Sequence, residues 1–136
     1  MTDITHLLKE AEAAYQYAVA PSSGFRVGTA LQSSDGRVFT GCNIESPVYL
    51  GVCAERVALF KALSEGSREF EALAIVCEEG LPCPPCGTCR QLLWEFAPAL
   101  QIIVRGQNGV PLTYAIEDLL PAVFERGGRQ PFRPKN

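Results

Sequence analysis

The sequence predicts an α/β fold in which a mixed sheet of about five strands is covered by helices on both faces. The apolar residues alternate between helical and strand spacing along the chain, in the order α-β-β-α-β-α-β-β-α. Two short apolar runs, 73–77 and 101–105, have the pattern of strands covered on both faces. Because 136 residues normally form one domain with one core, we expect a single three-layer α-β-α sandwich over residues 1–136.

The chain is expected to open with a helix followed by a hairpin. Apolar side chains recur at helical spacing over residues 4–18, which predicts an amphipathic helix that ends before Pro21. The strand-like segments 27–33 and 37–42 flank Asp35-Gly36, a turn in which both residues accept positive φ. These two segments are therefore expected to pair as a β-hairpin.

Three further elements are expected besides the buried strands. Residues 53–65 are apolar on almost every side, which predicts a central helix closed by Gly66. A third helix is expected to begin near Gly87. Asn108-Gly109 predicts a turn, and residues 115–120 predict a short final helix.

Charge and hydropathy exclude two classes of partner. The net charge is −3 and no run of Lys or Arg precedes the tail, whereas a nucleic-acid surface needs a basic stripe. No apolar run reaches the length of a membrane span, and the first six residues lack the pattern of a signal peptide. We expect a cytoplasmic protein with a small, weakly charged substrate.

The tail 126–136 is expected to be flexible or to contact another subunit.

The six cysteines predict a metal site. In a reducing compartment they serve as metal ligands or buried apolar residues more often than as disulfides. Cys42 and Cys77 lie in apolar strand-like stretches and are expected to be buried. Cys53, Cys86 and Cys89 supply three thiolates, and a catalytic zinc site takes three protein ligands and leaves the fourth position to water.

The three expected ligands fall at the starts of two helices. Cys53 begins the second helix, and Cys86 and Cys89 begin the third, so free N–H groups and the positive dipole ends stabilise their thiolates. Arg56 is expected to donate hydrogen bonds to ligand sulfurs and so to withdraw negative charge from the metal. The alternative for this arginine is a solvated position at the helix start.

A second pair of cysteines has the same spacing. Cys83 and Cys86 also match Pro-Cys-x-x-Cys, but the two prolines between them have no N–H groups to donate to sulfur or to start a helix. This favours Cys86 and Cys89. The alternative is that Cys83 supplies a fourth thiolate and closes the site as a structural one, against which Glu55 weighs because a structural site needs no carboxylate.

The run Cys53-Ala54-Glu55-Arg56 with Pro85-Cys86-Gly87-Thr88-Cys89-Arg90-Gln91 resembles the free-nucleoside cytidine deaminases, which are zinc-dependent. The resemblance spans nearly the whole chain and implies their fold, one Zn²⁺ per chain and a homotetramer. Five further blocks carry it: 20–21, 25–28, 41–45, 64–66 and 119–124.

The resemblance implies hydrolytic removal of the amino group from C4 of cytidine or 2′-deoxycytidine, giving uridine products and ammonia. Zinc lowers the pKa of water toward neutrality, and Glu55 takes its proton, delivers it to ring N3 and protonates the departing ammonia. The chain has one histidine, His6, which lies far from every motif and is expected to be an ordinary surface residue.

The resemblance also assigns the substrate contacts. Asn43 and Glu45 are expected to hold the ribose hydroxyls, Phe25 to pack against the pyrimidine ring, and the Ala54 N–H to bind the base carbonyl. From the residues alone, the alternatives are that Asn43 and Glu45 are turn residues and that Phe25 is a core residue.

In the four-subunit members of this family a neighbouring chain completes the site. Tyr49 and Phe124 match the positions implicated, and for both the alternative is a place in the core of this chain.

Three departures from the family surround the expected pocket entrance. Ser22 stands where a Tyr is usual, the run 46–48 differs, and the stretch 43–53 is one residue short. The extra space implies that N4- or C5-substituted cytidines are also accepted. Two other functions stay open: a blasticidin-S-type aminohydrolase, whose hairpin resembles residues 33–37, and a structural zinc-binding interaction module without turnover.

Overall fold

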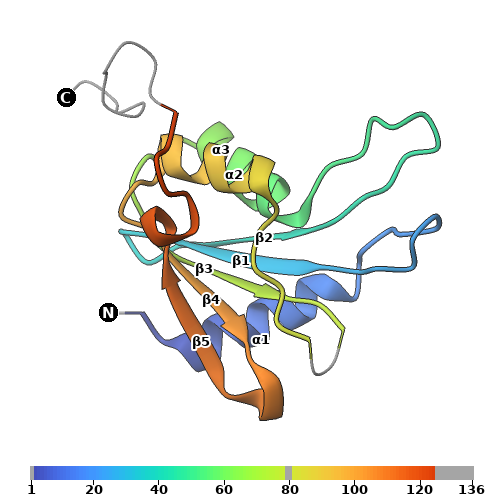
Figure 1. Ribbon diagram of the computed structural model, residues 1–136, viewed down its shortest axis with the longest axis horizontal. Coiled ribbons are helices and arrows are strands. Elements are labelled where there is room, and N and C mark those ends of the chain that lie inside the picture. Colours follow the sequence, from blue (N-terminus) through green and yellow to red (C-terminus); the bar gives the residue numbers. More distant parts are fainter. Residues whose placement is uncertain (1, 79–80, 125–136) are drawn as a thin grey trace.

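A computed structural model describes residues 2–78 and 81–124 of the chain, so the expected tail 126–136 lies outside the described residues. Its centre is a mixed five-stranded sheet in the order β2-β1-β3-β4-β5 (Figure 1). β3 and β4 are parallel and the other neighbours are antiparallel. The strands are β1 (Gly28–Ser33), β2 (Val38–Cys42), β3 (Phe70–Val76), β4 (Gln101–Arg105) and β5 (Pro111–Ala115).

Helices cover both faces of the sheet, which confirms the predicted three-layer α-β-α sandwich. α1 (Ile4–Tyr15) lies on one face, and α2 (Ala54–Ser64) and α3 (Gly87–Phe96) lie on the other (Figure 1). Half of the buried core residues beneath α1 are alanines, and a Cβ atom on Gly28 of β1 would lie 2.2 Å from the Ala11 carbonyl oxygen, so the helix approaches the sheet closely. The core beneath α2 and α3 contains the larger buried residues, among them Leu59, Leu73, Leu93, Trp94 and Ile102.

The strand directions decide where the functional residues gather. β2 and β3 are both antiparallel to β1, and β4 is parallel to β3, so these three strands end at the same edge of the sheet. α2 follows β2 and α3 follows β3 on the same face. The first turns of both helices therefore meet beyond the carboxyl ends of the strands, where open α/β sheets bind ligands.

Two predicted helices have different ends in the structure. α1 ends at Tyr15 because the next three residues close single turns with i→i−3 hydrogen bonds, after which the Val19 N–H donates to the Asn43 carbonyl oxygen (2.9 Å). The predicted final helix is a 3₁₀ helix over Ile116–Leu119, since Ala115 still belongs to β5. The predicted turn at Asn108-Gly109 is confirmed, and both residues have positive φ there.

The prediction that Cys42 and Cys77 are buried is wrong, because both are only half-buried. Cys42 is the last residue of β2, an edge strand, and Cys77 comes directly after β3. Packed layers cover the middle of a strand more completely than its end, so an apolar run overstates burial at its last residue.

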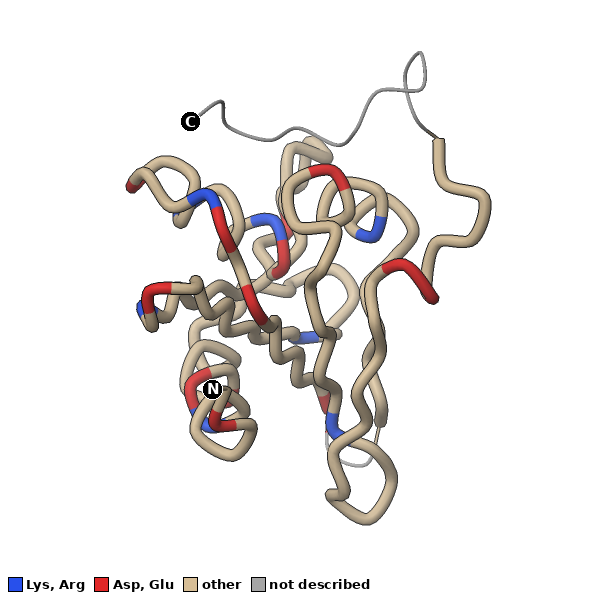
Figure 2. The backbone as a smooth tube through the Cα atoms, turned by 90° about the vertical axis from the view of Figure 1, so that its left-hand side faces the viewer, with Lys and Arg blue, Asp and Glu red and all other residues tan. Residues whose placement is uncertain are grey.

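The charges of the described residues are interspersed in sign over the surface (Figure 2). Acidic and basic residues fall in several separate segments of the tube, and no run of consecutive Lys or Arg occurs within residues 2–78 and 81–124. Within residues 2–78 and 81–124, no helix is long and apolar enough to cross a membrane.

Candidate metal centre and active site

Cys53, Cys86 and Cys89 occupy the first turns of two helices, as the sequence predicts. Cys53 is the N-cap residue of α2 and Cys86 is the N-cap residue of α3, and both have extended backbone conformations. Neither side chain caps its own helix. The two helix starts therefore offer their thiols and their unpaired N–H groups to the same space.

The ligand atoms of Cys53, Glu55, Cys86 and Cys89 all lie within 4.8 Å of one another. In a tetrahedral site with Zn–S bonds of about 2.3 Å, neighbouring sulfurs are about 3.8 Å apart. The cluster therefore fits a single metal ion held by three sulfurs. Cys83 does not belong to this group among the described residues, although it packs on the same core as α2 and α3.

The electrostatics of the cluster also fit a bound cation. Burial raises the pKa of Glu55 and that of Cys89, and the nearby Glu55 carboxyl raises the Cys89 pKa further. Burial alone would raise the pKa of Cys86, but hydrogen bonds from the Cys89 N–H and from the Cys89 and Cys53 thiols hold it below its ordinary value. So many acidic groups in one partly buried cluster resist joint ionisation unless a divalent cation offsets their charge.

Arg56 lies over the thiol cluster and not on a solvated helix face. Its Nη2 donates a hydrogen bond to Cys53 Sγ (3.4 Å), and this hydrogen bond is the main reason that the pKa of Arg56 is raised. Its Nε is buried without a hydrogen-bond partner among the described residues. The guanidinium thus places positive charge beside a sulfur of the cluster, where the sequence predicts it.

A close packing contact fixes the start of α2. A Cβ atom on Gly41 would lie 2.4 Å from the Ala54 carbonyl oxygen, so only glycine fits at this position of β2. The buried Thr29 donates its hydroxyl to the same oxygen (2.9 Å). No sequence motif assigned a structural role to either residue, although glycine inside a strand is the signal that indicates such a close approach.

Asn43 is held by the backbone of the segment that carries Phe25. Its Oδ1 accepts a hydrogen bond from the Val27 N–H and its Nδ2 donates to the Phe25 carbonyl oxygen, both at 2.8 Å. This is the turn role that the residue type alone indicated. A primary amide has two donors and two acceptor sites, so Asn43 keeps capacity for a ligand.

Glu45 is held by the same segment. Its Oε1 accepts hydrogen bonds from the N–H groups of Ser22 (2.9 Å) and Ser23 (3.1 Å), and its Oε2 accepts one from the Ser23 hydroxyl (2.6 Å). The Ser23 hydroxyl and then the two N–H groups hold the pKa of Glu45 below its ordinary value. Glu45 is therefore an ionised, oriented acceptor.

A hollow of about 430 Å³ joins the predicted sugar-binding residues to the metal cluster. Phe25, Ala54 and Glu55 are not among the residues that line it. Its lining includes Ser22, Asn43, Glu45, Tyr49, Cys53 and Arg56.

The exposed aromatic residues do not belong to the core. Phe25 is 41% exposed, Tyr49 96% and Phe124 68%, which excludes the core positions considered as alternatives. His6 lies on α1 with an exposed side chain, as predicted for a surface residue.

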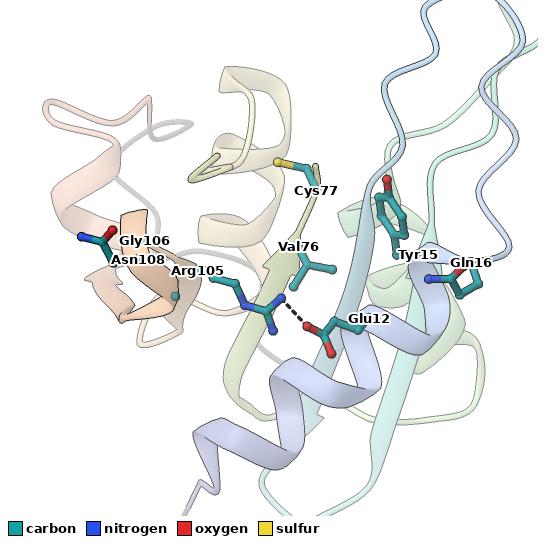
Figure 3. A pocket seen from close by; sticks show the side chains of 9 residues that line it. Glu12, Tyr15, Gln16, Val76, Cys77, Arg105, Gly106 and Asn108 are labelled. Atoms are coloured by element: carbon teal, nitrogen blue, oxygen red, sulfur yellow. Dashed lines mark ion pairs between the residues drawn. The ribbon is translucent and has the colours of Figure 1, made fainter. Parts of the chain in front are cut away.

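A second hollow, of about 760 Å³, lies on the α1 side of the sheet (Figure 3). The ion pair between Glu12 and Arg105 crosses it. None of the predicted substrate or metal residues lines this hollow, so it is separate from the thiol cluster.

Comparison with known proteins identifies the family. The profile of the cytidine and deoxycytidylate deaminase zinc-binding region matches residues 1–105. The cytidine deaminase of Halalkalibacterium halodurans is 45% identical over 120 residues, which are 87% of this chain and 91% of that protein. The corresponding enzyme of Sporosarcina psychrophila is 40% identical over 126 residues, 91% and 93% of the two chains.

Solved structures agree with these sequence relatives. A crystal structure of cytidine deaminase from Burkholderia pseudomallei has a TM-score of 0.84 at 45% identity, covering 91% of this chain and 100% of that one. A blasticidin-S deaminase from Bacillus cereus is also related, at 30% identity over 74% of this chain and 77% of that protein. The described cluster of three cysteines and one glutamate is positioned to hold one metal ion per chain. The chain is therefore a zinc-binding hydrolase of the cytidine and deoxycytidylate deaminase family.

Proposed function

We propose that the protein catalyses the hydrolytic deamination of cytidine and 2′-deoxycytidine, releasing ammonia and forming uridine and 2′-deoxyuridine. The observation that carries this proposal is the buried carboxyl group of Glu55 beside three thiols, one of which, that of Cys53, belongs to a residue lining the same hollow as Asn43 and Glu45. Relatives 40–45% identical over most of the chain are named cytidine deaminases, which supports the same assignment.

In this proposal Cys53, Cys86 and Cys89 hold the zinc ion. When bound there, zinc lowers the pKa of an adjacent water molecule toward neutrality. Glu55 accepts the proton of the attacking water and passes it to N3 of the ring. The water oxygen adds to C4. Glu55 then takes the remaining proton of the added hydroxyl and donates it to the amino nitrogen, so that the C4–N4 bond breaks, ammonia leaves and the C4 carbonyl forms. Burial raises the pKa of the Glu55 carboxyl above its ordinary value, which moves it toward the range suited to a group that both accepts and donates a proton.

The remaining residues orient the nucleoside. Asn43 and Glu45 have unused hydrogen-bonding capacity for the sugar hydroxyls, and the half-exposed face of Phe25 is available to the pyrimidine ring. The Ala54 N–H lies in the first turn of α2, where it has no intrahelical acceptor, and binds the base carbonyl.

Substrate range tests these assignments. Free cytosine is expected to be a far poorer substrate than cytidine, by about 10²-fold or more in kcat/KM, because it leaves the two sugar-binding side chains without their ligand. Steady-state kinetics with cytidine, deoxycytidine, cytosine, 5-methylcytidine and an N4-substituted cytidine are the measurement. Efficient turnover of cytosine would contradict the sugar contacts, and rejection of every substituted ring would contradict the roomier pocket that the short Ser22 side chain implies.

The same measurement separates the other functions. A structural zinc module would bind zinc without forming uridine from cytidine. A blasticidin-S-type enzyme would turn over blasticidin S and leave cytidine nearly untouched. The higher identity and coverage of the cytidine deaminases favour the nucleoside.

We also propose that the chain is one domain over residues 1–136 and that four copies assemble into a homotetramer. The loop between β2 and α2 projects from the molecule (Figure 1) and leaves Val48 65%, Tyr49 96% and Leu50 82% exposed. Phe124, at 68% exposure, is another uncovered aromatic residue. Such apolar surface is typical of a contact between subunits, where Tyr49 and Phe124 would reach a neighbouring site.

Light scattering tests the assembly. The mass in solution is expected to be about four times the 14.8 kDa of one chain, and Tyr49→Ala is expected to weaken the tetramer and lower activity together. Full activity in a purely monomeric sample would contradict a site completed by a neighbour.

A cytoplasmic location also belongs to this proposal, since three zinc-binding thiols must stay reduced.

A further inference from the structure

The hydroxyl group of Ser23 links two residues of the proposed nucleoside site. It donates a hydrogen bond to Oε2 of Glu45 (2.6 Å) and accepts one from the Phe25 N–H (3.0 Å). One serine side chain therefore joins the carboxylate assigned to the sugar with the segment that carries the aromatic ring assigned to the base.

The two neighbouring serines contribute differently to this arrangement. Ser22 gives Glu45 only its backbone N–H, which any residue but proline would supply. Ser23 gives its N–H to Oε1 and its hydroxyl to Oε2. The backbone bonds hold Oε1 in place, and the hydroxyl bond to Oε2 then sets the rotation of the carboxylate plane, a torsion that is otherwise broad.

The arrangement leaves room for a ligand. A carboxylate offers about four acceptor sites, and the described residues occupy three of them at Glu45. Glu45 is half-buried and lines the hollow of about 430 Å³ that also reaches Cys53. A sugar hydroxyl that enters the hollow thus meets an acceptor whose direction is already fixed.

We propose that Ser23 is a positioning residue for sugar recognition: its hydroxyl orients the free acceptor site of the Glu45 carboxylate toward a hydroxyl of the nucleoside sugar and couples this orientation to the Phe25 segment. The inference rests on the proposed function and adds to it a residue that itself makes no contact with the reacting atoms. A pre-oriented carboxylate lowers the ordering cost of binding, so the contribution falls on KM and not on the chemical step.

The test compares Ser23→Ala, Ser23→Val and Ser23→Thr with cytidine as substrate and 2′,3′-dideoxycytidine as competitive inhibitor. Threonine and valine have nearly the same shape, but threonine carries a hydroxyl where valine carries a methyl group. Comparing these two variants therefore isolates the effect of the hydroxyl even if the alanine variant disturbs the loop. Loss of the hydroxyl in the Ala and Val variants is expected to raise KM for cytidine about 3- to 10-fold, with kcat within about twofold of the parent. The Thr variant is expected to restore KM.

The inhibitor separates positioning from mere loop stability. Because 2′,3′-dideoxycytidine lacks the hydroxyls that would donate hydrogen bonds to Glu45, its Ki is expected to change by less than about twofold in the Ala and Val variants. Ser34→Ala, an exposed serine on the β1–β2 turn, is the control for general effects. Equal weakening of cytidine and the inhibitor, or an unchanged KM for cytidine, would overturn the role of Ser23. A parent enzyme that does not deaminate cytidine at all would instead overturn the proposed function, and the inference with it.

Discussion

Replacement of Glu55 by glutamine is expected to lower kcat for cytidine by at least about 10²- to 10⁴-fold, the usual contribution of general acid–base catalysis. Glu55 is 5% exposed and lies in the first turn of α2, within 4.8 Å of three cysteine sulfurs. Glutamine keeps the size of the side chain and removes the group that accepts and returns the proton. Because one carboxyl serves the water, N3 and the leaving ammonia in turn, the loss is expected at the high end of this range.

The measurement is steady-state turnover of cytidine, with zinc content and thermal unfolding determined on the same samples. Both of these are expected to match the parent, since no ligand sulfur is changed. Glu65→Gln, at the exposed carboxyl end of the same helix, removes an equivalent charge away from the cluster and is the matched control. Activity of the Glu55→Gln enzyme within about tenfold of the parent would exclude the proton-shuttle role.

The thiol cluster could be predicted from sequence because its determinants are local. Cysteines at two helix starts, with proline before and glycine after Cys86, define where the ligands lie along the chain. The two helix starts also have to lie close together in space, and they do so because β2 and β3 run in the same direction. That direction is a consequence of strand order, which apolar periodicity does not specify.

The substrate end of the site shows why other details could not be predicted. Asn43 and Glu45 bind the segment from Ser22 to Val27, which lies 16 to 23 residues earlier in the chain. These bonds form because an isolated bridge between Val19 and Ile44 brings the two segments side by side. Residue types alone indicated either turn formation or sugar binding for these side chains. The structure shows hydrogen bonds of the first kind and leaves capacity for the second, so sugar binding by the same side chains stays a prediction.

The proposed role of Ser23 could not be predicted from the sequence either, because no motif includes this residue. Serine directly before glycine is an ordinary turn residue, and nothing in its neighbourhood in the sequence points to Glu45. Only the folded chain shows that its hydroxyl bridges two assigned substrate contacts.

Serine in place of Cys89 is expected to remove zinc and abolish detectable turnover, whereas serine in place of Cys83 is expected to leave one zinc per chain and activity near that of the parent. Cys89 is fully buried in the first turn of α3, and its sulfur is within 4.8 Å of the other ligand atoms. A serine hydroxyl does not ionise to replace the thiolate, so the remaining two sulfurs hold the metal too weakly to retain it.

Cys83 provides the comparison because it is a half-buried thiol in the segment that leads into α3, six residues before Cys89. Its sulfur is outside the four-residue cluster, and burial raises the pKa of its thiol, which keeps it protonated at neutral pH. The two prolines that follow it cannot donate N–H groups to a metal-bound sulfur. Metal analysis and X-ray absorption of the parent and both variants are the measurements, with three sulfurs and one oxygen expected around zinc in the parent. Four sulfurs, or loss of zinc on Cys83→Ser, would show that the site is closed by a fourth thiolate, and a zinc ion without an open position would have no place for the water that the proposed reaction consumes.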